Sequence, residues 1–138
     1  MRWSFSSLVA AAAVAACVTT TTRIFLPSAQ NPVYTPAQAE PVLGEYLRLQ
    51  CATLRAARKP DSGSAHFLLD VDSTGATTRA ELRRATRDDM LDGIFGTVAA
   101  QLALGAGGPS RRARRDPVTM SYRCAGDSAS VRVVAPDR

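Results

Sequence analysis

The sequence predicts an α+β fold in which a small antiparallel sheet of about three strands packs against two helices. Two observations lead to this prediction. Apolar residues recur at helical spacing in two segments, and in others they alternate along the chain as in half-buried strands. The 138 residues suffice for one domain with a modest core. A net charge of +5 suits a domain near an anionic surface, and only 6% of the residues are aromatic, which argues against nucleic-acid binding by base stacking.

The first 17 residues resemble a bacterial signal peptide. Arg2 precedes an apolar run from Leu8 to Ala16, which is too short to span a bilayer alone. The letters VAAC at its end resemble a lipobox, so Cys17 would be lipidated and would become the mature N-terminus. Two alternatives stay open here: an uncleaved anchor, and cleavage after Ala39. We expect export to the periplasmic face of the cell envelope, with membrane anchoring at Cys17.

Residues 18–40 are rich in Thr and Pro and have no sustained period, which predicts a tether to a domain at 41–138. The domain opens with apolar residues at helical spacing, namely Leu43, Leu47, Cys51 and Leu54. Pro41 suits a first helical turn and Pro60 ends the element. We therefore expect a helix from about Val42 to Arg58.

Two strands joined by a turn are expected next. The apolar residues of the first strand alternate at Ala65, Phe67, Leu69 and Val71, which predicts one face in a core. Asp72 to Gly75 form the turn. Residues 76–84 are ambiguous, because their Thr-rich start favours a strand whereas the letters AELRR favour a helix.

A second helix and a final strand region complete the domain. Thr86 and Asp89 resemble a capping box, and apolar residues follow on one helical face as far as Leu102, before the letters GAGGPS end the helix. The letters RRARR (111–115) predict an exposed basic loop, which is either solvated or contacts anionic lipid or an acidic partner. Residues 118–124 alternate as a strand, and residues 130–134 form a further short strand or an extension of it.

The cysteines are consistent with an exported protein. If Cys17 carries lipid, Cys51 and Cys124 remain as a pair, and in an oxidising compartment such a pair is most simply a disulfide. The alternative is two buried free thiols. The bridge would close a loop of about 70 residues and stabilise the domain by roughly 4 kcal/mol.

The stretch DVDSTGATTRAE (70–81) resembles a calcium-binding EF-hand loop, and it supplies an alternative function. Its side-chain ligands would be Asp70, Asp72, Thr74 and Glu81. However, the alternation before the loop, and Thr77 where an aliphatic residue is usual, favour a hairpin turn. With His66 as the single histidine, a multi-histidine zinc or haem site is implausible, and we expect no cofactor.

Several features at one joint spacing resemble the C-terminal domain of TonB-type energy transducers. Gly63 precedes the alternating strand, the turn Asp72–Gly75 follows, residues 76–86 take the place of the second strand, and the letters MLDGIF from Met90 take the place of a helix start. The resemblance covers roughly residues 52–124. The family's Pro-rich spacer and motor-coupling membrane helix have no counterpart in this sequence.

The resemblance implies a non-enzymatic interaction module of the cell envelope. In the family, the last strand binds an extended segment of an outer-membrane receptor by strand addition, as part of transport. Carried over to this chain, the exposed edge would be the strand with Val131 and Val133, or else the strand with Val118, Met120 and Tyr122. The residues suggest no catalytic group, because the aspartates 88, 89 and 92 lie at a helix start, where carboxylates favour the helix dipole.

Overall fold

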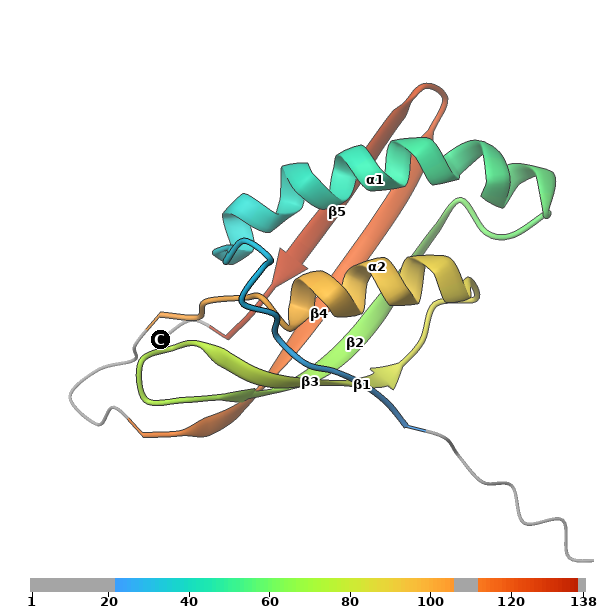
Figure 1. The fold of residues 1–138 in the computed structure, drawn as a ribbon. Helices are drawn as coiled ribbons and strands as arrows, with labels where there is room; N and C mark the ends of the chain where they lie inside the picture. Colours follow the sequence, from blue (N-terminus) through green and yellow to red (C-terminus); the bar gives the residue numbers. More distant parts are fainter. Residues whose placement is uncertain (1–21, 106–111, 137–138) are drawn as a thin grey trace, which may run out of the picture.

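The computed structural model describes residues 22–105 and 112–136, which form one five-stranded antiparallel sheet and two helices. The elements are, in order, β1 (Arg23–Phe25), α1 (Pro36–Ala56), β2 (Ser62–Val71), β3 (Thr77–Arg84), α2 (Asp89–Ala99), β4 (Arg114–Ala125) and β5 (Ser128–Val134). The sheet order is β1-β3-β2-β4-β5, and both helices cover one face (Figure 1). The predicted α+β class is confirmed. The predicted count of about three strands is too low, because β1 and β5 extend the sheet at its two edges.

Helix α1 begins earlier than predicted, at Pro36 instead of Val42. The Thr35 hydroxyl accepts the N–H of Gln38 at 3.2 Å, and the Gln38 side chain accepts the N–H of Thr35 at 3.0 Å. This reciprocal capping box holds a first turn that has no apolar period of its own. Pro41 consequently lies inside the helix and not in its first turn.

The early start of α1 and the presence of β1 correct the predicted tether. Residues 23–25 are a strand and residues 36–40 are helical, so an unstructured segment over the whole of 18–40 is wrong. Between them, the N–H of Tyr34 donates to the carbonyl of Gln101 at 3.0 Å, which ties the connection to the end of α2. Within residues 22–105 and 112–136, neither helix combines the length and apolarity needed to cross a membrane.

The ambiguous segment 76–84 is strand β3. Ala80 and Leu82 are buried and lie in register with Leu69 and Phe67 of β2. Pairing with β2 and burial under the helices therefore override the helical propensity of its second half.

Helix α2 is capped by Asp88, whose carboxylate accepts the N–H of Leu91 at 2.9 Å. The predicted capping box from Thr86 to Asp89 is wrong. The N–H and the hydroxyl of Thr86 instead donate to Asp92, at 2.8 and 2.7 Å. Asp92 is almost fully buried, so these hydrogen bonds satisfy a carboxylate that would otherwise be costly to bury.

Two further boundaries differ from the prediction. Helix α2 ends at Ala99 and not at Leu102, which instead forms an isolated bridge with Tyr34. The basic stretch 111–115 is not a loop throughout, because β4 begins at Arg114; Arg111 lies outside the described residues. Strand β5 pairs with β4 as a separate antiparallel strand, which settles that 130–134 is not an extension of β4.

The core lies between the helices and the covered face of the sheet. Helix α1 contributes Leu43, Leu47 and Leu54, each at most 1% exposed, and packs mainly on β5. The predicted disulfide is confirmed: Cys51 of α1 is bonded to Cys124 of β4, with their Cα atoms 5.8 Å apart. The bridge fixes α1 across the last hairpin of the sheet.

Candidate functional site

The five residues predicted to bind a partner lie in β4 and β5, and their side chains are buried. All are at most 6% exposed, namely Val118, Met120, Tyr122, Val131 and Val133. Because they face the helices, they cannot contact a partner through their side chains. Strand β4 lies between β2 and β5, so the alternative edge at Val118–Tyr122 is wrong. On this side of the sheet, the described residues leave only the outer backbone edge of β5.

The outer edge of β5 is partly covered by α1. The N–H of Val133 points away from β4 and donates to Oε1 of Glu40 at 3.2 Å. Since backbone groups alternate in direction along an antiparallel strand, those of Val131 and Ala129 also point outward. Gly44 lies beside this edge, where an added Cβ would be 3.6 Å from the carbonyl oxygen of Ala129. No described residue hydrogen-bonds the outward groups of Val131, but the residue is only 6% exposed beside α1, so an added strand would have to displace part of α1 from this edge.

The alternative calcium ligands are engaged in two separate sets of contacts. Asp72 turns back on its own hairpin: its Oδ1 accepts the Thr74 hydroxyl at 2.6 Å, the Thr74 N–H at 2.9 Å and the Ala76 N–H at 3.1 Å. The Thr74 hydroxyl, followed by the backbone N–H groups, lowers the pKa of Asp72. Gly75 completes the turn with a φ of 90°, which favours glycine. The predicted hairpin turn is confirmed.

The other two carboxylates belong to an ion-pair network on the face of the sheet that the helices leave open. Asp70 binds Arg115 at 2.9 Å and Arg79 at 3.7 Å, while Glu81 binds Arg83 at 2.9 Å and Arg115 at 3.3 Å. These carboxylates are neutralised by arginines. Among the described residues, no group of three or more His, Cys, Asp or Glu side chains could hold a metal ion.

His66 lies on the same open face and contacts two hydroxyl groups. Its Nε2 lies 3.2 Å from the Ser64 hydroxyl, and its Nδ1 lies 3.1 Å from the Thr119 hydroxyl. A serine beside a histidine is the contact by which a base activates a nucleophile. Here the partner of the second nitrogen is a hydroxyl and not the carboxylate of a triad, so the contacts serve to fix the orientation of both hydroxyls.

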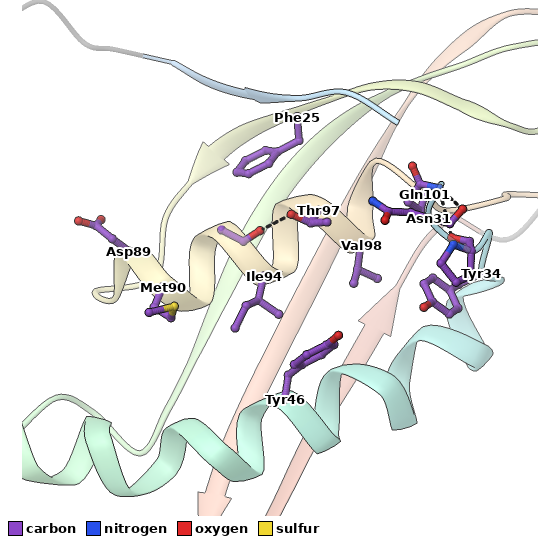
Figure 2. Close-up of a pocket in the computed structure, with 12 residues that line it drawn as sticks. Phe25, Asn31, Tyr34, Tyr46, Asp89, Met90, Ile94, Thr97, Val98 and Gln101 are labelled. Carbon is purple, nitrogen blue, oxygen red and sulfur yellow. Dashed lines mark hydrogen bonds between the residues drawn. The ribbon is translucent and has the colours of Figure 1, made fainter. Parts of the chain in front are cut away.

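An apolar groove lies between the two helices (Figure 2). It has a volume of about 540 Å³, within the range of ligand pockets. Tyr46 points into it from α1, and Met90, Ile94 and Val98 point into it from α2. Tyr46 and Met90 are 51% and 59% exposed, so the groove offers apolar side chains to solvent.

Gln101 builds one end of this groove. Its side-chain oxygen accepts the N–H of Ser28 at 2.7 Å, and its side-chain nitrogen donates to the carbonyls of Asn31 and Pro32 at 3.0 and 3.2 Å. The buried amide thus holds the connection from β1 to α1 against α2, and this places Tyr34 in the wall. The sequence prediction missed the groove because it assigned this connection to a tether.

One signal could have located both Glu40 and the wall of the groove. The letters TPAQ (35–38) match the S/T-x-x-E/Q pattern of a capping box, with proline at the first helical position. Read in this way, Glu40 falls on α1.

Cys17, the predicted lipidation site, lies outside the described residues. In comparisons with known proteins, no family model, no curated protein and no solved structure matches the chain.

Proposed function

We propose that the chain is an exported, lipid-anchored and non-enzymatic interaction module of the cell envelope, which captures an extended segment of a partner protein by strand addition at the outer edge of β5. The partner is a segment of an envelope protein such as an outer-membrane receptor, and the process is linked to TonB-type transport. Backbone hydrogen bonds to β5 supply the affinity.

The order of the elements supports this proposal. The resemblance to TonB C-terminal domains rests on a strand, a turn, a second strand, a helix and a last strand, and β2, β3, α2 and β4 follow in that order. In this chain β5 pairs with the far side of β4. The edge available for strand addition is therefore that of β5, and not that of the strand corresponding to the family's last one.

The observation that carries the proposal is the state of the β5 edge. The outward backbone groups of Val131 have no hydrogen-bond partner among the described residues, whereas the N–H of Val133 is held by Glu40. A partner strand that extends along the whole of β5 must replace the Glu40 carboxylate with a carbonyl oxygen of its own. Glu40 thus competes with the partner for one donor.

The position of β1 limits where capture takes place. If Cys17 carries the lipid, the chain from Cys17 to the start of β1 at Arg23 spans at most about 22 Å. The domain would remain close to the membrane that holds the anchor. The partner segment would therefore have to reach that membrane surface.

Photocrosslinking followed by binding measurements tests the proposal. In the full chain, a photoreactive residue at position 130, on β5, should crosslink to a partner, whereas one at position 83, on β3, should not. The crosslinked segment is identified by mass spectrometry and synthesised. The peptide should then slow the hydrogen exchange of the Val131 and Val133 N–H groups. Protection that appears on α2 instead would overturn strand addition at β5.

Glu40→Ala and Glu45→Ala provide a matched pair for the affinity measurement. Glu45 is also on α1, but its carboxylate pairs with Arg48 at 2.7 Å and hydrogen-bonds no described backbone group of β5. Glu40→Ala frees the Val133 N–H and should tighten binding about threefold to tenfold, the net value of one ordinary hydrogen bond. Glu45→Ala should change nothing. Val133→Pro removes this N–H without touching the ladder to β4 and should abolish capture in a chain that still melts cooperatively.

A further inference from the structure

The open face of the sheet carries a second surface, at the end opposite the Asp70–Glu81 network. Six side chains from three strands form it, and we call it the serine–arginine face: Ser62 and Ser64 of β2, Ser121 and Arg123 of β4, and Ser130 and Arg132 of β5. They line a shallow hollow of about 900 Å³. The four serines are short, so the hollow has a floor of hydroxyl groups between two long cationic side chains.

The strand register fixes the relative positions of these side chains. Arg123 lies between Ser62 and Ser130 across the three strands, and Ser121 lies between Ser64 and Arg132. Arg123 and Arg132 are therefore diagonal neighbours on adjacent strands, with Cα atoms about 7–8 Å apart. Both guanidinium groups can reach the same point above the hollow, because no bulky side chain stands between them.

The charges on the two ends of the open face are balanced differently. At one end, Arg79, Arg83 and Arg115 are paired with two carboxylates. On the serine–arginine face, no carboxylate of the described residues forms an ion pair with Arg123 or Arg132. Glu40 also lines the hollow; its Oε1 accepts the N–H of Val133, and its carboxylate forms no ion pair with either arginine. Two uncompensated cations on adjacent strands repel each other, and an anion bound between them relieves this repulsion.

We propose that the serine–arginine face binds a phosphate group. A guanidinium donates two parallel N–H bonds to phosphate oxygens, and two guanidiniums approaching from opposite corners match a tetrahedral group that presents several oxygens. Serine hydroxyls below it donate to the remaining oxygens. His66 fixes one of them, since its Nε2 lies 3.2 Å from the Ser64 hydroxyl. The site uses side chains of the open face, whereas strand addition uses the backbone of β5, although Glu40 and Val131 lie beside both.

An NMR titration of the full chain with inorganic phosphate tests the site. Phosphate should shift the side-chain Nε–H signals of Arg123 and Arg132 and the amides of the four serines, with saturation. Arg123→Gln and Arg132→Gln should each weaken binding at least about tenfold, because each removes a bidentate contact. Both side chains are exposed and unpaired among the described residues, so the melting temperature should not change.

Arg83→Gln is the matched control, because it removes the same charge from the same face but from an arginine that already pairs with Glu81. It should leave the phosphate affinity unchanged. Equal weakening by Arg83→Gln and Arg132→Gln, or shifts that do not saturate, would overturn the proposal, since attraction to the net positive charge would then suffice.

Vesicles distinguish the two sources of the phosphate group. The full chain is sedimented with phosphatidylcholine vesicles and with vesicles that also contain phosphatidylglycerol. If the extra binding to the anionic vesicles falls in Arg123→Gln and Arg132→Gln but not in Arg83→Gln, the ligand is a lipid head group. If phosphate titrates the site but the vesicles give no such difference, the ligand is a soluble phosphorylated molecule. If phosphate does not titrate the site and the three variants bind the anionic vesicles equally, the site is refuted.

Discussion

Asp88 joins two parts of the chain through a single carboxylate. It caps α2, and it accepts a hydrogen bond from Nζ of Lys59, in the connection before β2, at 2.7 Å. Burial by itself would raise the pKa of Asp88, but the hydrogen bonds from Lys59 and from the N–H of Leu91 outweigh it and hold the pKa below its ordinary value. The same contact raises the pKa of Lys59. The lowered pKa of Asp88 and the raised pKa of Lys59 both mean that the folded chain favours the charged forms of the two side chains.

Asp88→Asn should therefore remove a pH-dependent contribution to stability. A lowered pKa stabilises the fold above the unfolded value of about 3.9, and the contribution is lost as the pH falls through the folded pKa. Asparagine is an equally good helix cap, so the substitution removes mainly the charge. We expect a melting temperature a few degrees lower at pH 7, and a difference from the wild type that shrinks below about pH 4.

Asp89→Asn is the control for this prediction, because it removes the same charge one residue later and keeps the Lys59–Asp88 hydrogen bond, leaving only the weaker effect of the Asp89 charge on Lys59 to be subtracted. The Asp89→Asn variant should still lose the Asp88 contribution to stability as the pH falls, as the wild type does. Parallel melting curves of Asp88→Asn and the wild type from neutral to acidic pH would contradict the assignment.

Single residues whose role depends on local spacing could be predicted from the sequence. The turn from Asp72 to Gly75 follows from its own letters, and the pairing of Cys51 with Cys124 was predicted from the number of cysteines and an expected export, which stays a prediction. Asp88 and Glu40 could not be assigned in this way. Their partners, Lys59 and the Val133 N–H, are 29 and 93 residues away, and only the fold brings them together.

At the scale of elements, β1 shows how a three-residue strand is held. Its Phe25 packs edge-on against Phe67, with ring centroids 6.3 Å apart, and lies directly on Gly96 of α2. The ring leaves no room for a methyl group on Gly96. The glycine is therefore required by the approach of β1 and not by helix geometry.

Gly96→Ala should release β1 from the sheet. The added methyl group collides with the Phe25 ring, at a cost of about 1–3 kcal/mol for overpacking, which exceeds the gain of up to about 1 kcal/mol in helix propensity. Denaturant unfolding and hydrogen exchange of residues 23–25 measure the effect. Phe25→Ala in the same chain should relieve the collision, so the double variant should be less destabilised than the sum of the single variants.

Gly93→Ala is a matched control in the same helix. Its added Cβ would meet only the end of the Arg23 side chain at 3.6 Å, an ordinary contact. Alanine should therefore stabilise α2 there by up to about 1 kcal/mol. A Gly96→Ala variant as stable as Gly93→Ala would show that Phe25 does not hold β1 in place.

Elements with a long period could be predicted, and short or polar ones could not. The alternation of 65–71 and the helical spacing from Leu43 to Leu54 appear as β2 and α1. Strand β1 has too few residues to show a period, and the first turn of α1 is marked by its cap alone. Residues 76–84 needed the pairing with β2 to decide between strand and helix, and this pairing is not a local property.

At the scale of the whole molecule, the candidate site depends on strand order. Val131 and Val133 were placed correctly in a strand, and β5 is an edge of the sheet. Only the assembled sheet shows that the side chains of Val131 and Val133 face the helices. It also shows that β4 is paired with a neighbouring strand along both of its edges. The division of the open face into a neutralised end and a cationic end likewise needs the register of four strands.

The disulfide joins the two halves of this assembly, and its removal should measure how much it restricts the unfolded chain. The bridge links residues 73 positions apart and joins α1 to β4. Replacing both cysteines with alanine, Cys51→Ala with Cys124→Ala, should lower the free energy of unfolding by about 4 kcal/mol, as loop closure predicts. If the cross-link is responsible, Cys51→Ala alone should cost nearly as much, because either change opens the loop. Denaturant unfolding of the full chain makes the comparison. A single variant that loses only half of what the double variant loses would assign the effect to side-chain packing under α1.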